Sequence, residues 1–442
     1  MQFISDAMVS LSSKADSFKN INQIVKSHGY PFEKHHYETK DGNINMVIRI
    51  SGEKGTDSLK NIENNGPKKS VVILQHGLNC SATDWILNSH NSLAFILADN
   101  GYDVWINNSR GNRYSRNHVT LDPDHDKKQY WDYSFEEMAK FDQPALFDFV
   151  LNKTGAKNVS YVGHSQGTTQ MFCALSNNMD YFRSRLNLFV ALAPVVKLDN
   201  CSNSLIKLVK DSKTIEQMMV KYGLYELTPL KSNKKSVAYL HRLLPSISDL
   251  GIKLLSDEDT SEINPKSIEA FMAHYPSGTS LKTLLHFKQL MNRREFRHFD
   301  YGKEENLKRY GQEDAPMIPL ENIDDFPVAL IAGTEDKLAD IEDVRWLREQ
   351  MAKQGSLIFY EEHKIGHLAF LIPKNLIVYQ QVVNLLKTFN PIYVPAKEGK
   401  LFKQSSSLAA DDEIIAQVQQ VQQQIDQKQI LIEDNFAKLK TF

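Results

Sequence analysis

Hydrophobic residues are distributed along the chain in two patterns, short apolar-rich runs and longer stretches with helical spacing. The short runs have the length expected of buried strands, and they lie at residues 70–75, 102–106, 159–162, 188–196 and 326–332. The run within 70–75, Val-Val-Ile-Leu, is unbroken, which is typical of a strand buried on both faces. The stretches between these runs have the periodicity of amphipathic helices. This alternation predicts an α/β fold with a mostly parallel central sheet.

Turn-forming and capping residues indicate where some of these elements begin and end. Residues 36–50 contain an Asp-Gly turn between two strand-like segments, which predicts a hairpin. Ser134 and Glu137 have the spacing of a capping box at the start of an amphipathic helix, and Gly155 suits its end. Pro144 predicts a kink within that helix.

The alternation of strands and helices stops after residue 195 and resumes near residue 326. The intervening segment contains several helix-like stretches and no clear buried strand, so we expect a helical cap inserted into the sheet domain. The expected divisions are an N-terminal extension (1–20), the first part of the core (21–195), the cap or lid (196–315), the second part of the core (316–398), and a linker with a Gln-rich helical tail (399–442).

The tail has apolar residues seven positions apart at Val418, Ile425, Ile432 and Leu439. A stripe of this kind is typical of a coiled-coil seam, but Lys428 and Asn435 interrupt the complementary positions. Two interpretations stay open. The helix folds back on the chain's own body, or residues 411–439 dock on a protein partner.

The composition excludes several classes of protein. The 442 residues are 41% hydrophobic and 10% aromatic, enough for a large core, so wholesale disorder is excluded. The formal net charge of -2 leaves no basic field for nucleic acid. Three cysteines (Cys80, Cys173 and Cys201) do not form a disulfide framework.

The first ten residues contain an acid and no continuous apolar core, which predicts no secretory signal. Nothing in the sequence approaches the roughly 18 consecutive apolar residues of a membrane span. We therefore expect a cytoplasmic protein without a transmembrane segment. A lysosomal or secreted protein is expected only if further residues precede this N-terminus.

The first candidate for a catalytic residue lies in the segment Gly163-His164-Ser165-Gln166-Gly167. This segment follows a predicted strand and precedes a predicted helix. In that context the pattern G-x-S-x-G predicts a nucleophile elbow, a sharp turn that exposes the serine above the sheet. A serine hydroxyl becomes a useful nucleophile only when a base takes its proton and a third group orients the base.

The partners of such a serine follow in the order acid and then histidine, each just beyond a strand. Asp336 follows the strand at 326–332, and His367 follows the next strand, so these two are the favoured partners. Glu335 and Asp340 remain alternatives for the acid, and His363 for the base.

Acyl transfer also needs hydrogen-bond donors for the oxyanion that develops on the carbonyl. One candidate is the backbone N–H of Gln166, which follows the serine. The other is the backbone N–H of Leu78, beyond the strand at 70–75. We expect His76 and His164 to pack beside the glycine turns instead of acting in catalysis.

Longer motifs make the chain resemble the acid lipases, the α/β-hydrolase family of gastric and lysosomal acid lipases, from about residue 21 to residue 390. The stretches that carry the resemblance are HGYP (28–31), LQHGL (74–78), SATDW (81–85), SLAFILAD (92–99), GYDVW (101–105), NSRGN (108–112), YVGHSQGTT (161–169), PSGTS (276–280) and FDYG (299–302).

The resemblance implies an α/β-hydrolase with Ser165 as nucleophile, Asp336 and His367 as its partners, and the N–H groups of Leu78 and Gln166 as the oxyanion hole. It implies a mobile lid within the cap and no metal or organic cofactor. It also implies neutral lipid esters as substrates, triacylglycerols or sterol esters, met at a lipid–water interface.

The chain departs from the family at three points. Ala369 stands where the family has an acid near the histidine, the family's cap disulfide has no counterpart, and the secretory signal is missing.

The leading hypothesis is a serine carboxylic ester hydrolase of the lipase type. The rival is a structural or scaffolding subunit that keeps the fold and docks through its C-terminal helix.

Overall fold

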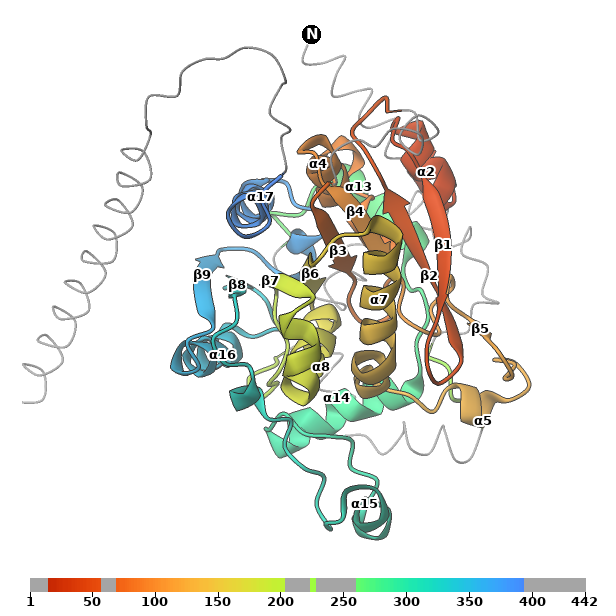
Figure 1. The fold of residues 1–442 in the computed structure, drawn as a ribbon, viewed down its shortest axis with the longest axis vertical. Helices are drawn as coiled ribbons and strands as arrows, with labels where there is room; N and C mark the ends of the chain where they lie inside the picture. Colours follow the sequence, from red (N-terminus) through yellow and green to blue (C-terminus); the bar gives the residue numbers. More distant parts are fainter. Residues whose placement is uncertain (1–14, 57–68, 203–222, 228–259, 393–442) are drawn as a thin grey trace, which may run out of the picture. The chain divides into compact units, whose positions relative to one another are not determined.

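The computed structural model describes residues 15–56, 69–202, 223–227 and 260–392. At the centre of this part is a sheet with strand order β1-β2-β4-β3-β6-β7-β8-β9, in which β5 pairs with β2 (Figure 1). The strands are β1 (Glu33–Glu38), β2 (Asn43–Ile50), β3 (Val71–Gln75), β4 (Asp103–Asn107), β5 (Asn117–His118), β6 (Val159–His164), β7 (Leu186–Leu192), β8 (Val328–Gly333) and β9 (Leu357–His363).

The strands from β4 to β9 in this order run parallel, whereas β1, β2 and β5 form an antiparallel edge. Every residue of β3, β4, β6 and β8 is buried. Unbroken apolar runs arise because helices cover both faces of a parallel sheet. The predicted α/β class with a mostly parallel sheet is confirmed.

Helices alternate with the strands, and Figure 1 shows α7 and α8 beside one another on one face of the sheet. The helices outside the cap are α2 (Ile21–Ser27), α4 (Leu93–Asp99), α5 (Lys127–Tyr130), α6 (Phe135–Glu137), α7 (Gln143–Thr154), α8 (Gln166–Arg183), α16 (Ile341–Lys353) and α17 (Ile377–Phe389). None of the helices in the described ranges is long and apolar enough to cross a membrane.

The predicted turns and caps are present. The Asp-Gly turn joins β1 to β2, the Ser134 capping box opens α6, and Gly155 ends α7 in the left-handed conformation with φ 64°. The kink predicted at Pro144 stays a prediction. A π-helical segment, Met138–Asp142, precedes α7 and places Pro144 in the first turn of α7, where a missing N–H is tolerated.

Between β7 and β8 the described residues form helices α13 (Pro265–His274), α14 (Leu281–Arg293) and α15 (Lys303–Tyr310). This agrees with a helical cap, although its boundaries at 196–315 and the other domain boundaries stay predictions. Residues 203–222 and 228–259 lie outside the described part, as does the predicted tail helix at 411–439.

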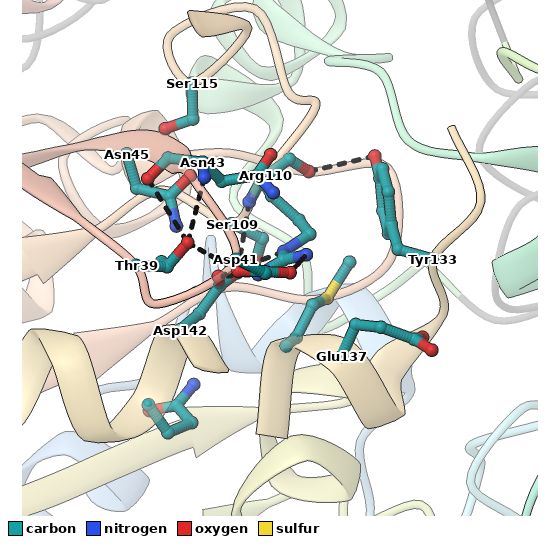
Figure 2. Close-up of polar contacts among 12 residues, drawn as sticks. Thr39, Asp41, Asn43, Asn45, Ser109, Arg110, Ser115, Tyr133, Glu137 and Asp142 are labelled. Atoms are coloured by element: carbon teal, nitrogen blue, oxygen red, sulfur yellow. Dashed lines mark hydrogen bonds and ion pairs between the residues drawn. The ribbon is translucent and has the colours of Figure 1, made fainter. Parts of the chain in front are cut away.

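A buried arginine ties three of these segments together. The Arg110 guanidinium, in the loop after β4, donates to Asp41 (Nη1–Oδ2, 2.7 Å) and to Asp142 (Nη2–Oδ1, 2.7 Å). Asp41 belongs to the β1–β2 turn and Asp142 ends the π-helical segment (Figure 2). The Tyr133 hydroxyl donates to the Arg110 carbonyl (3.0 Å). Burial acts to lower the pKa of Arg110, but the two carboxylates raise it above its ordinary value.

Replacing Arg110 therefore leaves two carboxylates without their partner, one of them fully buried. We expect Arg110→Met to lower the free energy of unfolding by about 3–5 kcal/mol, measured by chemical denaturation. Arg293→Met is the control, because Arg293 is 48% exposed and pairs with Asp300 in solvent, where the loss is below about 1 kcal/mol. Equal losses in the two variants would contradict this role of Arg110.

Candidate active site

Ser165 lies at the sharp turn between β6 and α8, with φ 55° and ψ −122°. A positive φ is strained for a residue with a side chain, and such strain persists only where the surroundings impose it. The flanking glycines are required by close packing. A Cβ atom at Gly163 would lie 2.9 Å from the Gly167 carbonyl carbon, and one at Gly167 would lie 2.6 Å from the Gln75 carbonyl oxygen.

Asp336 and His367 form a buried hydrogen-bonded pair. Asp336 follows β8, and His367 opens the short helix His367–Phe370 after β9. The His367 Nδ1 atom lies 2.7 Å from Asp336 Oδ2. The other Asp336 oxygen accepts from the backbone N–H groups of Leu338 and Ala339, both at 2.8 Å. A carboxylate held in this way keeps the proton on Nδ1, so Nε2 is the ring nitrogen that can accept one.

The alternative residues have other surroundings. Asp340 caps α16, its side chain accepting from a backbone N–H of the first turn. His363 bonds with the Gln381 side chain of α17 (2.9 Å). Glu335 is half-buried in the loop beside Asp336. The pair that the structure brings together is thus Asp336 and His367.

Ser165, His367, Leu78 and Gln166 all line one cavity of about 560 Å³. Helices α13 and α14 of the cap supply much of the opposite wall. The apolar side chains of this cavity include Phe271, Met272, Leu284, Phe287, Met291, Leu338, Leu368 and Leu371. The sequence-predicted site residues therefore meet at one apolar cavity, with Asp336 bonded to His367.

The two expected oxyanion donors come from different elements. Gln166 is the first residue of α8, where backbone N–H groups have no partner within the helix. Leu78 follows β3 in a loop that His76 holds. The His76 Nδ1–H donates to the Gly77 carbonyl (2.8 Å), and Nε2 accepts from the Ser109 N–H (3.0 Å). Burial lowers the pKa of His76 to about 4, which keeps the ring neutral.

Tyr379 supports the loop after His367, and the sequence analysis did not identify it. In that loop Ala369, which stands where the family has an acid, is buried. The Tyr379 hydroxyl of α17 lies 3.0 Å from the Phe370 carbonyl oxygen and 2.8 Å from that of Leu371. The available signal was a tyrosine inside an otherwise apolar helical stretch, because a buried phenol needs a hydrogen-bond partner.

Two other features of the site chemistry concern cysteines and metals. No disulfide joins Cys80, Cys173 and Cys201. Within the described ranges, no group of three or more His, Cys, Asp or Glu side chains is arranged to hold a metal ion.

A strained serine on a strand–helix turn, followed along the chain by an acid and a histidine beyond later strands, defines the class of α/β-hydrolases. Comparison with protein families agrees. Residues 70–372 match the model described as "alpha/beta hydrolase fold", and residues 21–89 match the one described as "partial alpha/beta-hydrolase lipase region".

Similar proteins narrow the class further. Human lipase member K is 35% identical over 84% of this chain and 91% of its own length. Lysosomal acid lipase/cholesteryl ester hydrolase of Macaca fascicularis is also 35% identical, over 84% and 91%. Bovine gastric triacylglycerol lipase is 34% identical over 85% and 93%. The chain belongs to the acid lipase family, and it is a carboxylic ester hydrolase of the lipase type.

The expectation of a cytoplasmic protein is wrong. Relatives matched over most of their length are lysosomal and gastric lipases, which points to a lysosomal or secreted protein. The expectation rested on the first ten residues and on the lack of an apolar run long enough to span a membrane. The low number of cysteines does not restrict the compartment either, because a chain with a core of this size folds without disulfides.

Buried neutral histidines predict how stability depends on pH. His76 and His286 both have their pKa lowered by burial to about 4. The unfolded chain binds these protons near pH 6.5, so stability falls as the pH drops from about 6.5 to 4. Each residue contributes up to about 3 kcal/mol to this loss. The free energy of unfolding, measured by chemical denaturation at several pH values in this range, should depend less steeply on pH in His76→Gln and in His286→Gln than in the wild type. A pH dependence as steep as that of the wild type would contradict this role of the two histidines.

Proposed function

We propose that the chain hydrolyses carboxylic esters of neutral lipids, with Ser165 as nucleophile, His367 as general base and Asp336 as the group that orients the base. The observation that carries this proposal is the 2.7 Å contact between His367 Nδ1 and Asp336 Oδ2, with His367 and the strained Ser165 lining one cavity. In this arrangement the bond to Asp336 places the imidazole proton on Nδ1, so Nε2 is the ring nitrogen that takes the hydroxyl proton.

In the first half of the reaction Ser165 Oγ attacks the ester carbonyl while its proton passes to His367 Nε2. The N–H groups of Leu78 and Gln166 donate to the oxyanion, which needs donors fixed before the charge develops. His367 then gives the proton to the leaving alcohol, and an acyl-enzyme remains. In the second half, water loses a proton to His367 and attacks the acyl carbonyl. The bond to Ser165 Oγ then breaks, His367 returns the proton to Oγ, and the acid leaves.

The apolar walls of the cavity support a lipid acyl chain as the group bound there. Burial of each methylene contributes about 0.8 kcal/mol, so a long chain binds well to Phe, Met and Leu side chains. Relatives named triacylglycerol lipase and cholesteryl ester hydrolase support neutral esters. Such esters collect in emulsions and membranes, so we infer that the enzyme works at a lipid–water interface.

The backbone strain at Ser165 favours an enzyme over a scaffolding subunit. A positive φ at a residue with a side chain destabilises the fold by about 1–3 kcal/mol, which a purely structural protein has no reason to retain. The docking helix of the rival hypothesis, at 411–439, lies outside the described residues.

Replacement of Ser165 tests the nucleophile. Ser165→Ala should lower kcat for a short-chain ester by several orders of magnitude without changing the thermal midpoint, because the hydroxyl acts in the reaction. Ser184→Ala, at the exposed C-terminal end of α8, should keep wild-type activity. A Ser165→Ala protein that hydrolyses the ester at the wild-type rate would refute the proposal.

Paired substitutions test the acid and the base against their neighbours. Asp336→Asn and His367→Gln should each lower kcat by about 10³-fold or more, since each removes or misorients the base. Asp340→Asn and His363→Gln should stay within a few-fold of the wild type. A large loss of kcat in Asp340→Asn or His363→Gln, with Asp336→Asn or His367→Gln active, would assign the role to the neighbour instead.

A further inference from the structure

His164 is a second histidine beside the proposed nucleophile, and the reaction described above does not use it. It is the last residue of β6 and lines the same cavity as Ser165 and His367. The side chain is buried, with 2% of the residue exposed. Its contacts show what this ring does there.

One ring nitrogen bonds the backbone of the proposed base. His164 Nε2 lies 3.1 Å from the carbonyl oxygen of His367. A carbonyl oxygen only accepts, so Nε2 carries the proton and donates. The other nitrogen, Nδ1, is buried and has no hydrogen-bond partner within the described part of the chain. The ring is thereby fixed in one tautomer by its bond to His367.

The two imidazole rings also touch. Their centroids are 4.7 Å apart and their planes are inclined by 49°. Asp336 bonds His367 Nδ1, whereas His164 contacts the ring face and holds the backbone carbonyl of His367. His367 is therefore held by a hydrogen bond to its side chain and by a second one to its main chain.

The charge state of His164 matters because His367 must accept a proton during the reaction. Burial lowers the pKa of His164 well below its ordinary value, and repulsion from His367 and His76 acts in the same direction. His164 therefore stays neutral, so it donates its hydrogen bond without placing a positive charge next to the base. A lysine or arginine here would oppose protonation of His367.

We propose that His164 is a positioning residue, whose Nε2–H bond to the His367 carbonyl holds the His367 imidazole where it can take the Ser165 proton. This inference rests on the proposed function. It replaces the simpler expectation that His164 only packs beside the glycine turn.

Two variants separate positioning from packing. His164→Phe keeps a planar ring of similar size against His367 and loses the donor. His164→Gln loses the ring, but its amide nitrogen lies at nearly the same distance from Cα as Nε2 and restores the donor. If the bond positions the base, His164→Phe lowers kcat by about 10- to 100-fold with KM unchanged, and His164→Gln recovers most of that loss.

The experiment measures kcat and KM for a short-chain ester, the thermal midpoint, and the rate at which a fluorophosphonate modifies Ser165. In that modification the serine oxygen bonds phosphorus, fluoride leaves and the proton passes to His367, so the rate reports on the base directly. We expect the rate to fall in His164→Phe in proportion to kcat. Wild-type kcat and labelling in His164→Phe, or a loss in His164→Gln as large as in His164→Phe, would overturn the proposal.

Failure of this inference differs from failure of the proposed function. If Ser165→Ala is inactive and His164→Phe is fully active, the positioning role is wrong and the nucleophile stands. If Ser165→Ala is active, the proposed function fails, and so does the role that depends on it.

Discussion

The backbone at Ser165 is the constraint on which the rest of the site depends. Ser165 has φ 55° and ψ −122° at the turn where β6, α8 and the end of β3 pack closely together. Gly163 and Gly167 follow from that packing. The same turn places the first N–H of α8 directly after the serine, so the proposed nucleophile and one proposed oxyanion donor come from a single turn.

Buried polar side chains hold several loops of the described part of the chain in place. Arg110 joins the β1–β2 turn to the π-helical segment, and His76 holds the loop that carries Leu78. The histidines close to the serine differ in their surroundings. His76 and His164 are neutral donors to carbonyl oxygens, whereas His367 bonds a carboxylate, which suits it to accept a proton.

Much of this was predictable from sequence. Strands β3, β6 and β8 are rich in apolar residues because they are buried on both faces, and the elbow is marked by its glycines. Asp336 and His367 were found through their positions after strands. The partners of Arg110 and the hydrogen bonds of His164 were not predictable. Hydrophobic periodicity indicates that a residue is buried, but it does not indicate which polar group forms a hydrogen bond with that residue. The π-helical segment before Pro144 was not predictable either, because such a segment is set by local packing.

In the proposed reaction Ser165 attacks an ester whose carbonyl oxygen accepts hydrogen bonds from two backbone N–H groups. The most direct test is a crystal structure of the protein after reaction with a lipid-like phosphonate fluoride, which mimics the tetrahedral intermediate. The account predicts phosphorus bonded to Ser165 Oγ, its oxygen within hydrogen-bond distance of the Leu78 and Gln166 N–H groups, and the alkyl chain in the cavity beneath α13 and α14. Phosphorus on another residue, or an oxygen directed away from both N–H groups, would contradict it.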